Sequence, residues 1–93
     1  MRTIRPTSRF RRDFKRELKG LNGGTLDAML TPVIDVLAAD ATLPPRYRDH
    51  PLTGNWIDCR DCHIRPDLVL IYRKPDEDSL ELVRLGSHSE LGL

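Results

Sequence analysis

The feature that most constrains the fold is an apolar run, Leu68-Val69-Leu70-Ile71-Tyr72, which has the length of one strand. Its near-continuous apolar character predicts a strand buried on both faces, at the centre of a sheet. Turn chemistry at 65–67 and a charged turn at 74–78 flank it, so strands at 56–64 and 80–85 should pack beside it. The second half of the chain therefore predicts a small antiparallel β-sheet.

Two helical patterns precede the sheet. After Thr7 or Ser8, either of which suits an N-cap, apolar residues recur at helical spacing and basic residues take the other faces; the apolar ones are Phe10, Phe14, Leu18 and Leu21. A glycine-rich turn at 20–24 ends this helix, and a second apolar face follows over residues 25–39. Pro32 either kinks the second helix or starts a shorter one capped by Thr31.

A chain of 93 residues closes only one hydrophobic core, so residues 1–93 should form a single domain. The predicted class is α+β, a two-helix hairpin packed on the small antiparallel β-sheet, with Thr3-Ile4 as an edge strand ended by Pro6. No apolar run approaches the roughly 18 residues of a membrane span, and the N-terminus lacks the apolar segment of a signal peptide. We therefore expect a cytoplasmic protein without a membrane partner.

The charge of the chain is unevenly distributed. The net charge is only +1, but residues 1–20 carry eight Arg or Lys against two acids. The basic face of the first helix, which includes Arg11, Arg12 and Lys15, is typical of proteins that bind RNA or an acidic protein segment. An ordinary solvated helix face has the same composition, so this feature alone leaves both interpretations open.

The segment Cys59-Arg-Asp-Cys62-His63 matches the C-x-x-C-H attachment motif of a c-type haem. Two observations argue against haem: the chain has no export signal, and a strand would place the two cysteines on opposite faces. The same separation argues against zinc, for which His50 would be the remaining ligand. We expect two reduced, partly buried thiols, no metal and no cofactor.

The histidines occupy positions where a rigid scaffold presents reactive groups. His50 follows an acid in a predicted loop, His63 shares a strand face with Asp61, and His88 stands just past a strand end. Imidazoles can donate or accept a proton near neutral pH, and Arg84 or Arg60 could hold a phosphate. This set suits metal-free RNA cleavage through the ribose 2′-hydroxyl, against the alternative of three surface histidines without a catalytic role.

The second half carries a series of spaced motifs: Asp49-His50-Pro51-Leu52, Gly54-x-Trp56, Arg60-Asp61-x-His63-Ile64-x-Pro66-Asp67-Leu68-x-Leu70-Ile71-Tyr72 and Arg84-x-Gly86-Ser87-His88-Ser89-Glu90-Leu91. Together these motifs resemble those of the YafQ-type toxins of the RelE/ParE superfamily. The resemblance covers the whole chain and implies the RelE/ParE-like, microbial-RNase-like fold. It also implies a toxin that cuts mRNA in the A site of the 70S ribosome and is neutralised by a cognate antitoxin.

Residue by residue, the resemblance implicates His50, His63, Asp67, Arg84 and His88, with Asp61 in support. It implies that His88 is the main acid, that His50 or His63 is the base with Asp67 orienting or assisting, and that Arg84 holds the scissile phosphate.

One position departs from the family pattern, which ends Ser-His-Ser-Glu-Leu-Phe, because this chain has Gly92 in place of the aromatic residue. An aromatic ring there would be expected to stack on or position a base. Two functions other than mRNA cleavage stay open. One is a non-catalytic, ParE-like toxin that binds DNA gyrase, which the histidine set argues against; the other is a degenerate, inactive toxin, which Gly92 favours.

Overall fold

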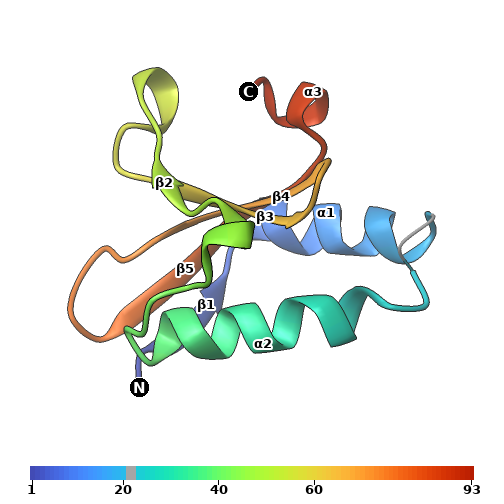
Figure 1. Ribbon diagram of the computed structural model, residues 1–93. Helices are drawn as coiled ribbons and strands as arrows, with labels where there is room; N and C mark the ends of the chain where they lie inside the picture. The colour runs from blue at the N-terminus through green and yellow to red at the C-terminus, as the bar shows by residue number, and fades with distance from the viewer. Residues whose placement is uncertain (21–22) are drawn as a thin grey trace.

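The computed structural model describes residues 1–20 and 23–93 (Figure 1). Leu21 and Asn22, predicted to end the first helix and to lie in the turn after it, fall outside the described residues. In chain order the elements are β1 (Thr3–Pro6), α1 (Ser8–Leu18), α2 (Leu26–Ala38), the 3-10 turn η1 (Pro45–Tyr47), β2 (His50–Pro51), the 3-10 turn η2 (Gly54–Trp56), β3 (Arg60–Arg65), β4 (Leu68–Arg73), β5 (Ser79–Gly86) and α3 (His88–Leu91).

Within the described residues the strands form one five-stranded sheet in the order β1-β5-β4-β3-β2. The apolar run forms β4 at its centre, as predicted. The pairs β2–β3, β3–β4 and β4–β5 are antiparallel. The exception is β1, the predicted edge strand, which runs parallel to β5. Helices α1 and α2 and strands β2 to β4 separate β1 from β5 in the chain, and a long connection of this kind permits a parallel pair.

Helices α1 and α2 lie on one face of the sheet (Figure 1), and a side-chain cap marks where α1 begins. The hydroxyl of Thr7 accepts a hydrogen bond from Phe10 N–H at 3.1 Å, so Thr7 rather than Ser8 is the N-cap of α1. Helix α2 continues through Pro32. The missing donor is tolerated there because Leu30 and Val33 on either side of the proline are buried in the core.

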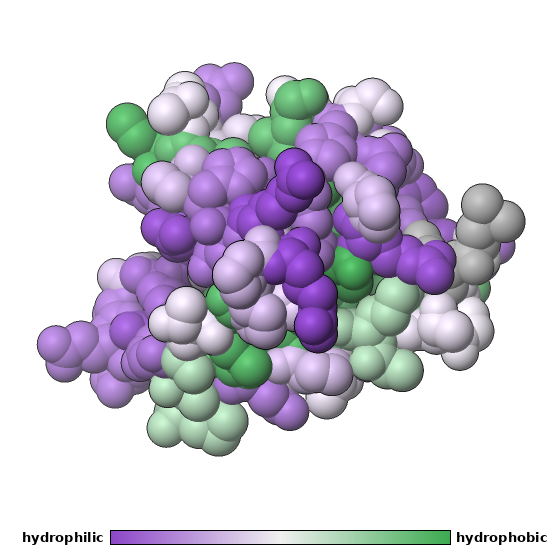
Figure 2. Space-filling view, viewed as in Figure 1, coloured by the Kyte–Doolittle hydropathy of each residue, from purple (hydrophilic) through white to green (hydrophobic). Residues whose placement is uncertain are grey.

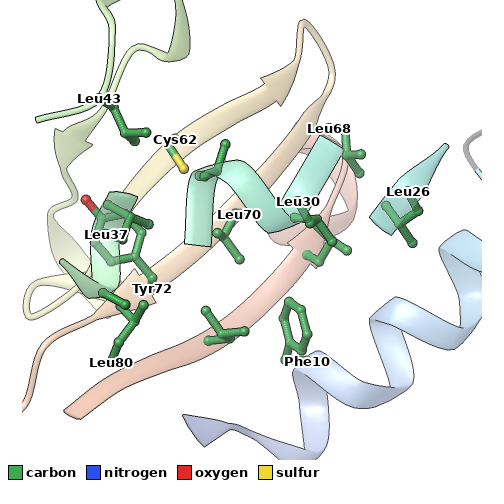
Figure 3. Close-up of a cluster of buried hydrophobic side chains, with 14 residues drawn as sticks. Phe10, Leu26, Leu30, Leu37, Leu43, Cys62, Leu68, Leu70, Tyr72 and Leu80 are labelled. Atoms are coloured by element: carbon green, nitrogen blue, oxygen red, sulfur yellow. The ribbon is translucent and has the colours of Figure 1, made fainter. Parts of the chain in front are cut away.

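Strand β4 is buried on both faces because each face contributes to a different apolar cluster. The main cluster lies between the helices and the sheet and includes Cys62 and Tyr72 (Figure 3). A smaller cluster on the opposite face contains Cys59, Val69, Ile71 and Leu91. The two cysteines therefore lie on opposite faces, as predicted. Burial raises the pKa of both thiols.

The segment before β3 differs from the prediction. A strand was expected over 56–64, but β3 begins at Arg60, and Trp56 ends the turn η2. Gly54 adopts a left-handed conformation with φ +64°, which an extended strand excludes. This turn packs Trp56 into the same cluster as Cys59, whereas uninterrupted alternation would have placed it on the opposite face.

The predicted loop at 40–55 is also partly ordered. It contains η1, and it contains β2, which pairs His50 with Asp61 and Pro51 with Arg60. His50 therefore lies on a short edge strand and not in a loop. No helix of the described residues is long and apolar enough to cross a membrane.

Candidate active site

The sheet face opposite the helices carries the candidate site. In β3, Asp61 and His63 point to this face because they alternate with Cys62, which points into the main cluster. The pairing of β2 with β3 sets His50 directly opposite Asp61. In Figure 1 this face lies between the loop that carries η2 and the C-terminal helix α3. The strand register thus brings His50, Asp61 and His63 together.

His88 reaches the same place from the next hairpin. Val69 at the start of β4 pairs with Gly86 at the end of β5, so the β3–β4 turn lies beside the start of α3. There the carboxylate of Asp67 accepts two hydrogen bonds from His88, one from the backbone N–H at 3.0 Å and one from the ring Nδ1 at 2.7 Å. Because Nδ1 donates to this carboxylate, Nε2 is the ring nitrogen left for a substrate.

Helix α3, which presents His88, is fixed in two ways. Ser87 and Glu90 form a capping box: the Ser87 hydroxyl accepts from Glu90 N–H, and the Glu90 carboxylate accepts from Ser87 N–H. Glu90 also lies 3.2 Å from Arg16 of α1. The short C-terminal helix is therefore anchored at its first turn, where His88 lies.

The three imidazoles lie next to one another. The rings of His63 and His88 meet edge to face with centroids 5.0 Å apart, and those of His50 and His63 are 6.4 Å apart. His63 is thus the middle ring. All predicted proton-transfer residues, His50, His63, Asp67 and His88, converge on this face.

Asp61 is the buried carboxylate beneath the rings, and 2% of its surface is exposed. Its Oδ1 lies 3.1 Å from Nδ1 of His50. That nitrogen is closer, at 2.6 Å, to the carbonyl oxygen of Arg48, which can only accept a hydrogen bond. Oδ1 is consequently a buried oxygen without a hydrogen-bond partner among the described residues.

The protonation equilibria of these groups differ. Burial raises the pKa of Asp61, and the positive charge on the neighbouring imidazoles, that of His50 first, opposes the rise. Burial lowers the pKa of His63; Asp61 opposes that shift, and nearby cations, His88 first, reinforce it. Hydrogen bonds from the backbone and ring of His88 lower the pKa of Asp67. These shifts favour a neutral His63 beside a His88 that is hydrogen-bonded to an ionised Asp67.

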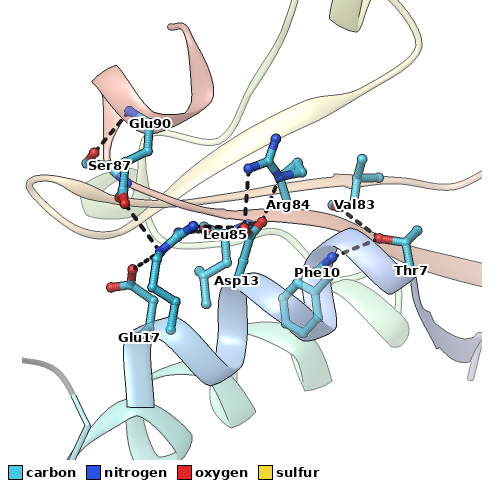
Figure 4. A network of polar contacts seen from close by, with 10 residues as sticks. Thr7, Phe10, Asp13, Glu17, Val83, Arg84, Leu85, Ser87 and Glu90 are labelled. Carbon is cyan, nitrogen blue, oxygen red and sulfur yellow. Dashed lines mark hydrogen bonds and ion pairs between the residues drawn. The ribbon is translucent and has the colours of Figure 1, made fainter. Parts of the chain in front are cut away.

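Arg84, the predicted phosphate ligand, is engaged with a carboxylate of α1 (Figure 4). Its Nε and Nη2 lie 2.7 and 3.2 Å from the two oxygens of Asp13. Asp13 also accepts hydrogen bonds from Leu85 N–H at 3.0 Å and from Arg16 at 3.1 Å. Burial alone would raise the pKa of Asp13, but these hydrogen bonds, that of Arg84 first, bring it below the ordinary value. This network ties α1 to β5.

The remaining predicted RNA-binding residues lie apart from the imidazoles. Arg60 contacts Asp49 at 3.1 Å, and Asp49 also accepts a hydrogen bond from Tyr72. Arg11, Arg12 and Lys15 are exposed on α1. Arg12 joins Arg9, Asp13 and Arg84 around a shallow hollow of about 310 Å³. The cations of α1, Arg11, Arg12 and Lys15, thus face the solvent on the α1 side of the molecule.

A cleft of about 690 Å³ beside His63 and His88 contains residues that the sequence patterns did not single out. It is lined by Arg46, Tyr47 and Arg48 of the η1 segment and by Arg65 and Pro66 of the β3–β4 turn, together with Ile64. Figure 2 shows strongly hydrophilic side chains gathered in front of η1 and β3. The available signal was the Arg-Tyr-Arg run in a proline-bounded segment, 44–51, but nothing local related it to position 65.

Gly92, the departure from the family pattern, follows α3 as its C-cap with φ +71°. A side chain added there would meet no atom within 4 Å, but the left-handed backbone would be strained. Glycine is therefore well suited to end this short helix.

Comparison with known proteins agrees with the fold and with the arrangement of the motifs. The model of the family described as bacterial toxin of type II toxin–antitoxin system, YafQ, matches residues 2–92. The mRNA interferase toxin YafQ of Escherichia coli K12 is 47% identical over 49 residues, which cover 53% of this chain and 52% of that protein. The chain thus spans about half the length of the curated relatives it matches.

Two solved structures cover nearly the whole chain. A metal-bound toxin from Helicobacter pylori is 46% identical with a TM-score of 0.87, over 98% of this chain and 99% of that one. YafQ in the E. coli DinJ–YafQ complex is 33% identical with a TM-score of 0.78, over 98% of each chain. Family match, whole-chain identity and fold agree, and the chain belongs to the YafQ family of bacterial toxins from type II toxin–antitoxin systems.

Proposed function

We propose that the protein is a ribosome-dependent endoribonuclease that cuts mRNA by acid–base transesterification through the ribose 2′-hydroxyl. The observation that carries the proposal is the convergence of three imidazoles above buried Asp61, with one of them, His88, held by ionised Asp67. Neighbouring groups with divergent pKa values are the arrangement that acid–base catalysis at neutral pH needs.

His63 is the better candidate for the base. Its lowered pKa keeps the ring neutral at physiological pH, so it can accept the proton of the 2′-hydroxyl. His50 is less suited, because its Nδ1 faces the Arg48 carbonyl and Asp61 from an edge strand. We assign His50 to positioning and to charge stabilisation of the pentacoordinate phosphorus.

His88 is the better candidate for the acid. As an imidazolium, His88 carries a proton on each ring nitrogen: Nδ1 donates to Asp67, which fixes the ring, and Nε2 gives its proton to the departing 5′-oxygen. The rings of His63 and His88 are neighbours, so acid and base flank one phosphate. Arg84 would have to share its guanidinium between Asp13 and that phosphate.

The substrate and partner follow from the relatives. A related protein is named an mRNA interferase, and another was solved in complex with DinJ. We propose mRNA in the A site of the 70S ribosome as the substrate, a cognate antitoxin as the partner and the cytoplasm as the location. The basic face of α1, with Arg11, Arg12 and Lys15 exposed, suits ribosomal RNA or an acidic antitoxin segment.

A metal-assisted mechanism is not part of the proposal. One relative is a metal-bound toxin. In this chain, however, no three His, Cys, Asp or Glu side chains of the described residues are grouped so as to hold a metal ion. The steps proposed above use side chains of this site alone.

The proposal is tested by expressing the wild type and His88→Ala under tight control and mapping mRNA ends on translating ribosomes. Codon-phased cuts that fall about 10²- to 10⁴-fold in the variant support it. Growth arrest without cuts, unaffected by His88→Ala, would instead indicate a ParE-like toxin that binds gyrase.

A degenerate toxin is the second candidate, because Gly92 removes the family's aromatic residue beside His88. In that case neither protein arrests growth or cuts mRNA, while antitoxin binding persists. Gly92→Phe would then restore cleavage, despite the strain at φ +71°.

A further inference from the structure

The cleft beside His63 and His88 concentrates positive charge in a chain that is nearly neutral. The whole sequence has 15 Lys and Arg against 14 Asp and Glu. Yet the described residues that line this cleft include Arg46, Arg48 and Arg65 and no acid. Arg46 lies in η1, Arg48 is its C-cap, and Arg65 ends β3, so the tertiary fold creates the charge cluster. Such a cluster attracts a polyanion.

Packing and hydrogen bonds hold the η1 wall of the cleft in place. Tyr47 is partly buried and packs against the main apolar cluster. Arg48 ends the turn with φ +51°, a conformation that is uncommon for a residue other than glycine, and its N–H donates to Pro45 O at 3.0 Å. Its carbonyl lies 2.6 Å from Nδ1 of His50, which links η1 directly to the candidate site.

The same wall offers a planar surface. The guanidinium of Arg46 lies over the ring of Tyr47, with its central carbon 4.9 Å from the ring centroid. One face of the guanidinium is thus occupied by the ring, and the side chain as a whole is exposed. Guanidinium planes and aromatic rings are the surfaces on which proteins stack unpaired bases.

We propose that this cleft binds the single-stranded RNA next to the scissile phosphate, with Arg48 and Arg65 on backbone phosphates and Arg46 stacked on a base. This inference rests on the proposed function, since it places the flanking nucleotides of the same substrate. The family's aromatic residue would stack on a base, but this chain has Gly92 in its place. We assign the stacking on a base of the RNA strand to η1 instead.

An acidic peptide would also match the charge, but two features favour RNA. The cleft includes the imidazoles of His63 and His88, so whatever fills it lies against the proton-transfer groups. The stacked pair of Arg46 and Tyr47 suits a flat base and offers nothing specific to a carboxylate side chain. The antitoxin is therefore the competing occupant, to be distinguished by experiment.

The first test uses the ¹⁵N-labelled wild-type protein and a single-stranded RNA hexanucleotide whose 2′-O-methyl groups prevent cleavage. At low salt, the titration should shift the backbone amide resonances of residues 46–48 and 64–65 in NMR spectra. Shifts confined to α1, or no shifts at all, would overturn the proposal.

Matched variants separate the two kinds of contact. Arg65→Ala removes a phosphate contact, so affinity for the hexanucleotide should fall about tenfold and the salt dependence should become shallower by about 0.7 in log–log slope. Arg46→Lys keeps the charge but loses the stacking plane, so affinity should fall while the slope stays the same. Arg5→Ala is the control, because Arg5 is exposed on β1, at the opposite edge of the sheet from β2.

The result is independent of cleavage. Absence of mRNA cuts on ribosomes would refute the nuclease but not RNA binding in this cleft. Conversely, wild-type affinity for the hexanucleotide in Arg65→Ala and Arg46→Lys refutes the cleft assignment while leaving the nuclease intact. If those variants lose the antitoxin and keep RNA, the occupant is a peptide and the proposal is wrong.

Discussion

Asp13 and Asp61 are almost equally buried, with 4% and 2% of their surfaces exposed, but their surroundings are opposite. Asp13 accepts hydrogen bonds from Arg84, Arg16 and Leu85 N–H, and its pKa is lowered. Asp61 has one oxygen without a hydrogen-bond partner in the described part of the chain, and its pKa is raised.

We propose that this difference separates a structural carboxylate, Asp13, from a functional one, Asp61. The hydrogen bonds and guanidinium charges around Asp13 offset the desolvation of its carboxylate, so Asp13 fastens α1 to β5. The charge of Asp61 is compensated mainly by imidazoles, which can themselves change protonation state. The protonation of Asp61 is therefore coupled to that of the imidazoles, as expected at a site of proton transfer. If the comparison is right, removing the two carboxylates should have opposite consequences for stability and activity.

Asp13→Ala should have the largest effect on stability. The substitution leaves Arg84 without its carboxylate partner and Leu85 N–H without its acceptor. Breaking a largely buried ion pair costs roughly 3 kcal/mol. Urea unfolding followed by circular dichroism measures the loss. Asp35→Ala, at an exposed position of α2, is the matched control and should change the unfolding free energy by less than about 0.5 kcal/mol.

Asp61→Asn should give the reverse pattern. The amide keeps the size of the side chain and removes a buried charge, so the free energy of unfolding at neutral pH should stay the same or rise. Cleavage should fall about 10²-fold, because His50 and His63 lose the carboxylate that balances them. Equal losses of stability in Asp61→Asn and Asp13→Ala would contradict the distinction between the two aspartates.

Arg84→Lys should have a smaller effect on stability, about 1 kcal/mol, because lysine keeps the charge but not the two-pronged contact with Asp13. It also tests the predicted phosphate role. If Arg84 only fastens β5, cleavage by the folded variant should equal that of the wild type. A loss of kcat in fully folded Arg84→Lys would instead place the guanidinium on the phosphate.

The smallest expected effect is a difference between Asp13 and Asp61 in how each makes stability depend on pH. Because the pKa of Asp13 is lowered in the folded state, its stabilisation is complete above the unfolded value near 4 and is lost as the pH falls through the folded value. The pKa of Asp61 is raised, so its ionisation disfavours the folded state as the pH rises from about 4 through its folded value. When the free energy of unfolding is plotted against pH, the curve of Asp13→Ala should therefore be flatter below pH 4 than that of the wild type. The curve of Asp61→Asn should lack the decline above pH 4.

Much of the fold was predictable from local pattern. The apolar run forms the central strand, the 3.6-residue periods correspond to α1 and α2, and Cys59 and Cys62 lie on opposite faces of the sheet as expected. The position of His50 was not predictable, because a two-residue strand such as β2 exists only through its pairing with β3. The start of β3 was misplaced because the left-handed Gly54 sets a turn that alternation does not reveal.

The sequence by itself determined which groups are available for the proposed proton transfer, and the spacing of its motifs indicated its family. Only the tertiary structure decided how those groups are arranged. Strand register set His50 over Asp61 and the Asp67 turn beside His88, and helix packing joined Arg84 to Asp13. It also assembled the arginine cleft from η1 and position 65. Such contacts join residues far apart in the chain, and their geometry and pKa shifts arise only when burial removes water from between them.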